Sequence, residues 1–223
     1  MQDIRRITLF MGHYGSGKTN AAINYAILLK TKGIDTAIYD LDIVNPYFRT
    51  VDGKNLLDKY GVELVASKYA ATNVDVPAME AGNYGIVDNR KKHAVVDVGG
   101  DDRGALALGR YAKDIIAENN YDMLLVVNKY RFETKDIDGV LNIKDEIERA
   151  CNIKFNGIVN NSNLGNETTA QTVLDSIAFI EEVSNKTGLK IKFTCIREDL
   201  YHSLQGNIKN LMPMQIIKYG SWQ

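Results

Sequence analysis

The sequence predicts an α/β domain built in three layers, with helices on both faces of a doubly wound, mostly parallel β-sheet. Apolar runs alternate with helical patterns along most of the 223 residues, as repeated βαβ units require. The predicted strands are continuous apolar runs, which is typical of strands that are buried on both faces. A glycine-rich loop joins the first strand to the first helix.

Composition sets the broad class of protein. Hydrophobic and charged residues make up 45% and 25% of the chain, and the formal net charge is −1. We therefore expect residues 1–223 to form one domain, with no strong sign of nucleic-acid or membrane partners. Cys151 and Cys195 stand alone, and no signal peptide or membrane-spanning run is recognisable. These features predict a cytoplasmic location.

In the first half of the chain, apolar runs and turn residues mark the elements in order. A proline and polar neighbours break the segment after the second strand, and glycines interrupt the helix before the fourth. The pattern predicts a strand at 4–11, a helix at 18–32, a strand at 36–42, a loop at 43–49, a short helix at 55–60, a strand at 62–66, irregular structure at 67–77, a poor helix at 78–91 and a strand at 93–98.

The second half continues the alternation. Thr134 is a plausible N-cap for one helix, and Gly188 ends another. Beyond residue 198 the pattern predicts no element. The expected elements are a helix at 104–119, a strand at 121–128, a helix at 134–151, a strand at 155–160, a helix at 167–187 and a strand at 191–196.

The loop after the first strand carries the strongest motif. Its residues, Gly12-His13-Tyr14-Gly15-Ser16-Gly17-Lys18-Thr19, read G-x-x-x-x-G-K-T, the phosphate-binding P-loop pattern. Its glycines allow backbone conformations that turn successive N–H groups toward one anion. The N-terminus of the following helix adds partial positive charge. The chain is therefore predicted to be a P-loop NTPase, with Gly12, Gly15 and Gly17 among its nucleotide-binding residues.

Side chains at the end of the loop complete the phosphate site. Lys18 is expected to reach the β- and γ-phosphates and to take part in catalysis. The hydroxyl of Thr19 is expected to bind Mg²⁺. Ser16 and Asn20, in the loop and in the first helical turn, are the remaining nucleotide-binding residues predicted here.

Three acids lie at predicted strand ends. Asp97 follows an apolar run and precedes Gly99-Gly100, the pattern of a Walker B acid that holds Mg²⁺ directly or through water. Asp40 and Asp42 are two residues apart in a strand and so point to the same side. We expect Asp42 to orient the attacking water and Asp40 to support the metal. The alternatives are a turn cap for Asp97 and a solvated strand end for the other two.

The order of these motifs resembles the MinD/ParA branch of P-loop ATPases. The features shared are the P-loop, a strand ending in Asp-x-Asp, and a strand ending in Asp-x-Gly-Gly, in the first half of the chain. The resemblance implies Mg-ATP and a homodimer that depends on nucleotide. It also implies that Asp42 activates water, while Lys18 and Thr19 bind phosphate and Mg²⁺.

One position departs from that family. Many members carry a second lysine directly after the first glycine of the loop, and it reaches the partner's nucleotide across a dimer. His13 occupies this position here, and an imidazole is shorter and mostly neutral at pH 7. We expect His13 to pack within the loop instead.

Base recognition is predicted less directly. In the resembling family an asparagine after a strand contacts adenine, which matches Asn161, with Asn160 as the alternative. The Asn-Lys-x-Asp motif that would recognise guanine is missing, because Asn128-Lys129-Tyr130-Arg131 lacks the acid. ATP is therefore favoured over GTP. Arg197, after the last strand, is expected either to wall the base pocket or to cap a helix.

These observations predict an Mg-dependent ATP-binding protein, a slow ATPase that acts as a nucleotide-dependent switch for an unknown protein partner. One alternative is a metabolic or cofactor-maturation enzyme that uses ATP for amidation, ligation or metal insertion. Another is a nucleotide-binding module with negligible turnover. The loop 45–49 carries two aromatic residues and an arginine. It is either a partner-binding switch loop or a locally packed one.

Overall fold

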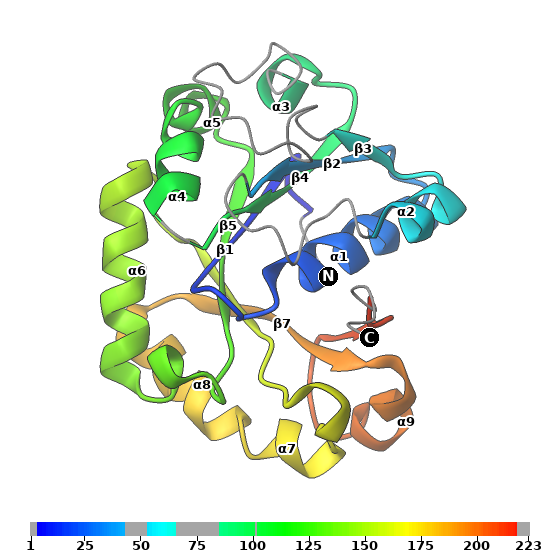
Figure 1. The fold of residues 1–223 in the computed structure, drawn as a ribbon, viewed down its shortest axis with the longest axis vertical. Coiled ribbons are helices and arrows are strands. Elements are labelled where there is room, and N and C mark those ends of the chain that lie inside the picture. Colours follow the sequence, from blue (N-terminus) through cyan, green and yellow to red (C-terminus); the bar gives the residue numbers. More distant parts are fainter. Residues whose placement is uncertain (1–3, 43–52, 66–84, 101, 218–223) are drawn as a thin grey trace, which may run out of the picture.

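The sheet is fully parallel and contains eight strands in the order β3-β2-β4-β1-β5-β6-β7-β8 (Figure 1). The structure is a computed structural model and describes residues 4–42, 53–65, 85–100 and 102–217. The predicted loop at 43–49 and irregular segment at 67–77 lie outside these residues. The strands are β1 Ile7–Met11, β2 Thr36–Leu41, β3 Glu63–Val65, β4 His93–Val98, β5 Tyr121–Val127, β6 Gly157–Asn160, β7 Lys190–Arg197 and β8 Leu211–Met214.

Helices cover both faces of this sheet, as the continuous apolar strands require. α1 and α2 pack on one face, and α4, α5, α6 and α8 pack on the other (Figure 1). Alternate residues of each strand supply the two cores. The helices are α1 Lys18–Thr31, α2 Lys54–Tyr60, α3 Gly85–Asp88, α4 Asp102–Gly109, α5 Ala112–Glu118, α6 Ile137–Cys151, α7 Ala170–Leu174, α8 Ile177–Thr187 and α9 Tyr201–Leu204.

Strand order places the reversal of winding beside β1. β1 pairs with β4 on one side and with β5 on the other, so the chain departs from β1 in both directions. In open α/β sheets the crevice at this point, at the carboxyl ends of the strands, is where ligands bind. The glycine-rich loop follows β1 and therefore lies in that crevice.

Three helix predictions are corrected. The predicted helix at 104–119 is two helices, because α4 ends at Gly109, where the chain packs against the end of α6. The predicted helix at 167–187 is also two, because Ser176 bonds to Val173 O and to Asn160 between α7 and α8. Thr134 is not an N-cap.

Asp136 caps α6 instead, by accepting a hydrogen bond from Gly139 N at 2.9 Å. The hydroxyl of Thr134 donates to Asn128 O at 2.6 Å, which holds a short 3₁₀ turn, Phe132–Thr134, before the helix. Because the Thr134 hydroxyl is used in this turn, Asp136 is the residue whose side chain accepts a hydrogen bond from the first turn of α6.

The tail forms an additional edge strand. β8 pairs in parallel with β7, and the segment after it runs back along α1. Two asparagines of α1 hold this segment: Asn24 bonds to both N and O of Gln215 at 2.8 and 3.0 Å, and Asn20 Oδ1 accepts from Ile217 N at 3.1 Å. The tail is thereby fixed beside the P-loop helix.

Candidate functional site

The loop between β1 and α1 has the backbone geometry that its glycines predicted. Gly15 and Gly17 have φ angles of 76° and 84°, in the left-handed region. At Gly12 a side chain is excluded for a second reason, because a Cβ there would lie 2.4 Å from Val126 O of the neighbouring strand. The loop therefore runs directly against the end of β5.

Lys18 and Thr19 are the first residues of α1, and both are buried. The Lys18 ammonium donates to His13 O at 3.3 Å, so it lies over the loop's own backbone. His13 Nδ1 lies 3.0 Å from Tyr14 O and 3.6 Å from a Glu133 carboxylate oxygen. The His13 side chain thus packs against the loop and the 3₁₀ turn, in line with the loop-packing expectation.

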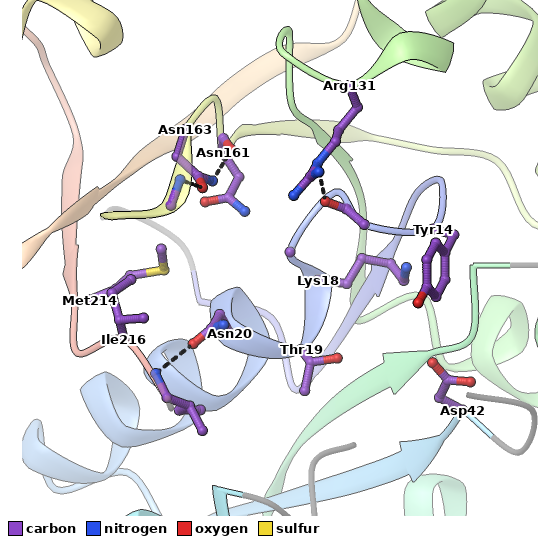
Figure 2. Close-up of a pocket in the computed structure, with 14 residues that line it drawn as sticks. Tyr14, Lys18, Thr19, Asn20, Asp42, Arg131, Asn161, Asn163, Met214 and Ile216 are labelled. Atoms are coloured by element: carbon purple, nitrogen blue, oxygen red, sulfur yellow. Dashed lines mark hydrogen bonds between the residues drawn. The ribbon is translucent and has the colours of Figure 1, made fainter. Parts of the chain in front are cut away.

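A cavity of about 380 Å³ opens beside this loop (Figure 2). One end carries the P-loop lysine and threonine with Asp42, and the other end is walled by asparagines and apolar tail residues. The lining residues are Tyr14, Gly15, Gly17, Lys18, Thr19, Asn20, Asp42, Arg131, Asn161, Asn163, Gly165, Met214, Ile216 and Ile217.

The three predicted acids lie on the α1 face of the sheet. Asp40 of β2 and Asp97 of β4 are register partners, so they sit side by side, and both are buried. Asp42 follows β2, lines the cavity, and donates its backbone N–H to Asp40 Oδ1 at 2.9 Å. The structure therefore brings Asp42 to the cavity and places Asp40 and Asp97 behind it.

The segment after Asp97, the predicted Walker B acid, also lies close to the P-loop at Gly100. A Cβ at Gly100 would lie 2.7 Å from Lys18 Nζ and 2.8 Å from Tyr14 N. The backbone after Asp97 thus approaches the phosphate-binding end of the loop closely. Within the described ranges no group of three or more His, Cys, Asp and Glu side chains is arranged to hold a metal ion by itself.

Asn161 stands at the other end of the cavity. Its Nδ2 donates to Ser16 O at 2.6 Å, and its buried Oδ1 has no hydrogen-bond partner among the described residues. Asn160, the alternative, points elsewhere: its amide bonds to Ser176 Oγ at 2.9 Å and to Ser162 N at 3.2 Å. Asn161 is therefore the asparagine available to a ligand.

Ser16 shows a second buried atom of this kind. Its hydroxyl oxygen is shielded from solvent and has no hydrogen-bond partner in the described part of the chain. Buried polar atoms are almost always satisfied, so these two atoms need an explanation. Asn161 lines the cavity and Ser16 does not, so a ligand in the cavity would account for Asn161 Oδ1. The residues that line the cavity fit a nucleotide.

Two predicted residues lie at the edge of the site. Asn20 lines the cavity, but its Oδ1 accepts from the tail, so it also holds the cavity wall. Arg197 does not line the main cavity. It makes a two-pronged pair with Asp199, donates to Asn166 O at 3.0 Å, and lines a smaller adjoining pocket of about 20 Å³.

Sequence reasoning missed Arg131 and the tail residues Met214 and Ile216 as parts of the site. Arg131 Nε donates to Gly15 O at 2.9 Å, across 116 positions of sequence. Its place in Asn128-Lys129-Tyr130-Arg131, at the end of β5, was a signal that could have found it. The tail carries no motif that would have shown its position.

Comparison with known proteins shows a similarity of fold. No family model and no curated protein matches the chain. Among solved structures it is similar to the cell division protein FtsY of Thermotoga maritima, with 16% identity and a TM-score of 0.58, over 88% of this chain and 63% of that one.

Two further structures agree. Chloroplast FtsY of Physcomitrella patens matches with 16% identity and a TM-score of 0.54, over 87% and 58% of the two chains. The signal recognition particle receptor FtsY of Elizabethkingia anophelis, in complex with GDP, matches with 14% identity and a TM-score of 0.54, over 88% and 58%. This chain therefore spans about three fifths of those proteins and has the fold of a P-loop NTPase.

A membrane-spanning helix is not found in the described part of the chain, since every helix there is too short or too polar to cross a bilayer.

Proposed function

We propose that this chain is a single nucleotide-binding domain that binds Mg-ATP and hydrolyses it slowly. The observation that carries the proposal is the meeting of Lys18, Thr19 and Asp42 in one cavity at the carboxyl ends of the strands. Lys18 would hold the β- and γ-phosphates, and backbone N–H groups of the loop would surround them. This residue set is the one that phosphoryl transfer uses.

The magnesium ion would be held by the Thr19 hydroxyl and by phosphate oxygens, with Asp97 and Asp40 behind it. Such an ion, when bound, neutralises charge that develops on the phosphates. Asp42 reaches the cavity itself, which supports a role in accepting a proton from, or orienting, the attacking water. Asp40 fixes the backbone of Asp42 through its 2.9 Å bond and so acts as a positioning residue.

Hydrogen-bond chemistry favours adenine over guanine. Guanine presents two neighbouring donors, N1–H and N2–H, at the edge by which an acid would recognise it, and the acid among the described cavity-lining residues, Asp42, lies at the opposite end from Asn161 (Figure 2). The Asn128 amide is already used, because its oxygen accepts from Tyr130 N and its nitrogen donates to Asn163 O. Asn161 has both an acceptor and a donor, as the adenine edge requires.

The exposed surface around the cavity supports a role as a switch. Tyr14 lines the cavity and is 51% exposed, and Phe132, next to Arg131, is 78% exposed. Exposed aromatic residues are enriched at protein interfaces. A protein partner, or a second copy of this chain, would contact them beside the nucleotide. The proposed regulatory consequence is that bound ATP changes the affinity for that partner.

The binding proposal is tested by titrating ATP into wild type and Lys18→Ala. We expect the variant to lose measurable affinity, because it removes the ammonium group that faces the phosphates. Lys135→Ala is the matched control, since Lys135 lies over the Phe132 ring at 4.2 Å and does not line the cavity. Equal ATP affinity in wild type and Lys18→Ala would disprove the site.

Hydrolysis and switching need separate measurements. Asp42→Asn is expected to keep ATP affinity and to lose turnover, and unchanged phosphate release would remove Asp42 from the mechanism. Sedimentation velocity with and without a non-hydrolysable ATP analogue tests the second-copy form of the switch. A sedimentation coefficient that does not respond to the analogue would leave only a different protein as the partner.

A further inference from the structure

Arg131 holds an unusual place in the cavity. It is the only cation other than Lys18 among the cavity-lining residues described above, and it comes from the loop after β5. Nε donates to Gly15 O, whereas the two terminal Nη groups have no hydrogen-bond or ion-pair partner among the described residues. Its charge and its planar face are therefore available to a ligand.

The orientation of the guanidinium is fixed by the P-loop. A Cβ built at Gly15 would lie 3.6 Å from Nε, 3.8 Å from Cζ and 3.9 Å from Cδ of Arg131. These near-equal distances mean that the planar group lies across the top of the loop. Figure 2 shows its end directed toward Asn161 and away from Asp42.

Arg131 and Asn161 donate hydrogen bonds to neighbouring carbonyl groups of the loop: Arg131 Nε to Gly15 O at 2.9 Å, and Asn161 Nδ2 to Ser16 O at 2.6 Å. The two side chains therefore lie next to each other against the loop, and Figure 2 shows both at the end of the cavity opposite Asp42. Arg131 belongs with Asn161 to the base end of the cavity.

The tail supplies the opposite wall of that end. Met214 and Ile216 line the cavity, and Ile216 is 46% exposed although its backbone neighbours are held to α1. An exposed apolar side chain on a fixed segment at a cavity is suited to cover the face of a flat ring. Asn161 lies between this wall and Arg131 and offers its unpartnered Oδ1.

We propose that the guanidinium of Arg131 stacks on one face of the nucleobase, while Ile216 and Met214 cover the other face and Asn161 bonds to its edge. The proposal rests on nucleotide binding at this site, as proposed above. Arginine stacks readily on aromatic rings, and a stacking contact with a base is worth roughly five- to a hundredfold in affinity.

The test compares two ligands, ATP and ribose 5′-triphosphate, which carries the same phosphates and no base. Affinities are measured by displacement of a fluorescent ATP analogue. Arg131→Ala and Arg131→Lys are both expected to weaken ATP about tenfold and to change ribose 5′-triphosphate less than twofold. The lysine variant keeps the charge and lacks the plane, so it separates stacking from simple attraction.

Three results would overturn the base contact. One is an equal loss for both ligands, which would mean that Arg131 acts on the phosphates or through the loop. The others are full ATP affinity in Arg131→Lys and unchanged affinity in Arg131→Ala. Lys18→Ala keeps this failure distinct from failure of the nucleotide site. If it still abolishes binding of both ligands, the site stands without the Arg131 contact. If wild type binds neither ligand, the site itself is wrong.

Discussion

The contact between Gly17 and Asn161 provides the sharpest test of how the base end is joined to the P-loop. Gly17 has φ 84°, and a Cβ there would lie 2.2 Å from Asn161 Nδ2. Gly17→Ala therefore has two costs. The left-handed conformation costs a residue with a side chain about 1–2 kcal/mol. Displacing Asn161 from Ser16 O costs about 1 kcal/mol more.

A matched glycine separates the two costs. Gly33, after α1, has φ 79°, and no atom of the described residues lies within 4 Å of the position that a Cβ would take there. Gly33→Ala therefore has only the conformational cost. In urea unfolding we expect Gly17→Ala to lose about 2–3 kcal/mol and Gly33→Ala about 1–2 kcal/mol. Equal losses in the two variants would refute the Asn161 contact.

Adding Asn161→Ala sharpens the measurement. On its own this change removes the bond to Ser16 O, whereas in the Gly17→Ala background it also removes the obstructing amide. The double variant should therefore be more stable than the sum of the single losses predicts, by about 1 kcal/mol. Simple additivity would mean that the two residues do not meet.

Three further predictions concern the rest of the molecule. Burial, helped by the charge of Arg6, lowers the pKa of His93 to about 4. As the pH falls, the His93 imidazole of the unfolded chain is protonated before that of the folded chain, so the free energy of unfolding should fall by about 3 kcal/mol from pH 7 to pH 4. Urea unfolding midpoints would show this decrease, and His93→Gln should make them depend less on pH. Asn24→Ala removes both bonds to Gln215 and should cost about 1–3 kcal/mol. Amide hydrogen exchange at 211–217 should rise, and unchanged exchange would show that Asn24 does not hold the tail. Burial raises the pKa of the Cys195 thiol, so a maleimide should label it only after unfolding. Rapid labelling of the native protein would contradict this.

Most strands of the sheet could be predicted because each can be recognised from the pattern of its own residues. Strands β1, β4 and β5 are runs of mainly apolar residues, and burial on both faces makes such runs necessary. Strand β7 instead alternates apolar and polar residues over most of its length, which is a second local signature of a strand. The tail strand β8, Leu211–Met214, has only four residues and contains Pro213. Proline is tolerated at the edge of a sheet, so nothing in the local pattern separates this strand from a loop.

The phosphate end of the candidate site was predictable for a related reason. Gly12–Thr19 is contiguous, and the acids follow apolar strands whose carboxyl ends must meet. The end of the cavity proposed to hold the base was harder to predict, because it is assembled from the loop after β5, the loop after β6 and the tail. The bond from Arg131 to Gly15 spans 116 positions, and no local rule reports it.

The choice of base illustrates why fold similarity alone does not set function. One similar solved structure, the FtsY of Elizabethkingia anophelis, holds GDP, and its chain is 14% identical to this one. In the site proposed for this chain, the side chains that would contact the base come from the loops after β5 and β6 and from the tail. Here those loops present the Arg131 guanidinium, which can only donate, and the Asn161 amide, which can donate and accept. A guanine would need acceptors for both N1–H and N2–H, and the acid among the described cavity-lining residues, Asp42, lies at the other end of the cavity. An adenine needs only one acceptor for its amino group, which Asn161 Oδ1 can provide. We therefore propose that the same fold binds a different base in this chain.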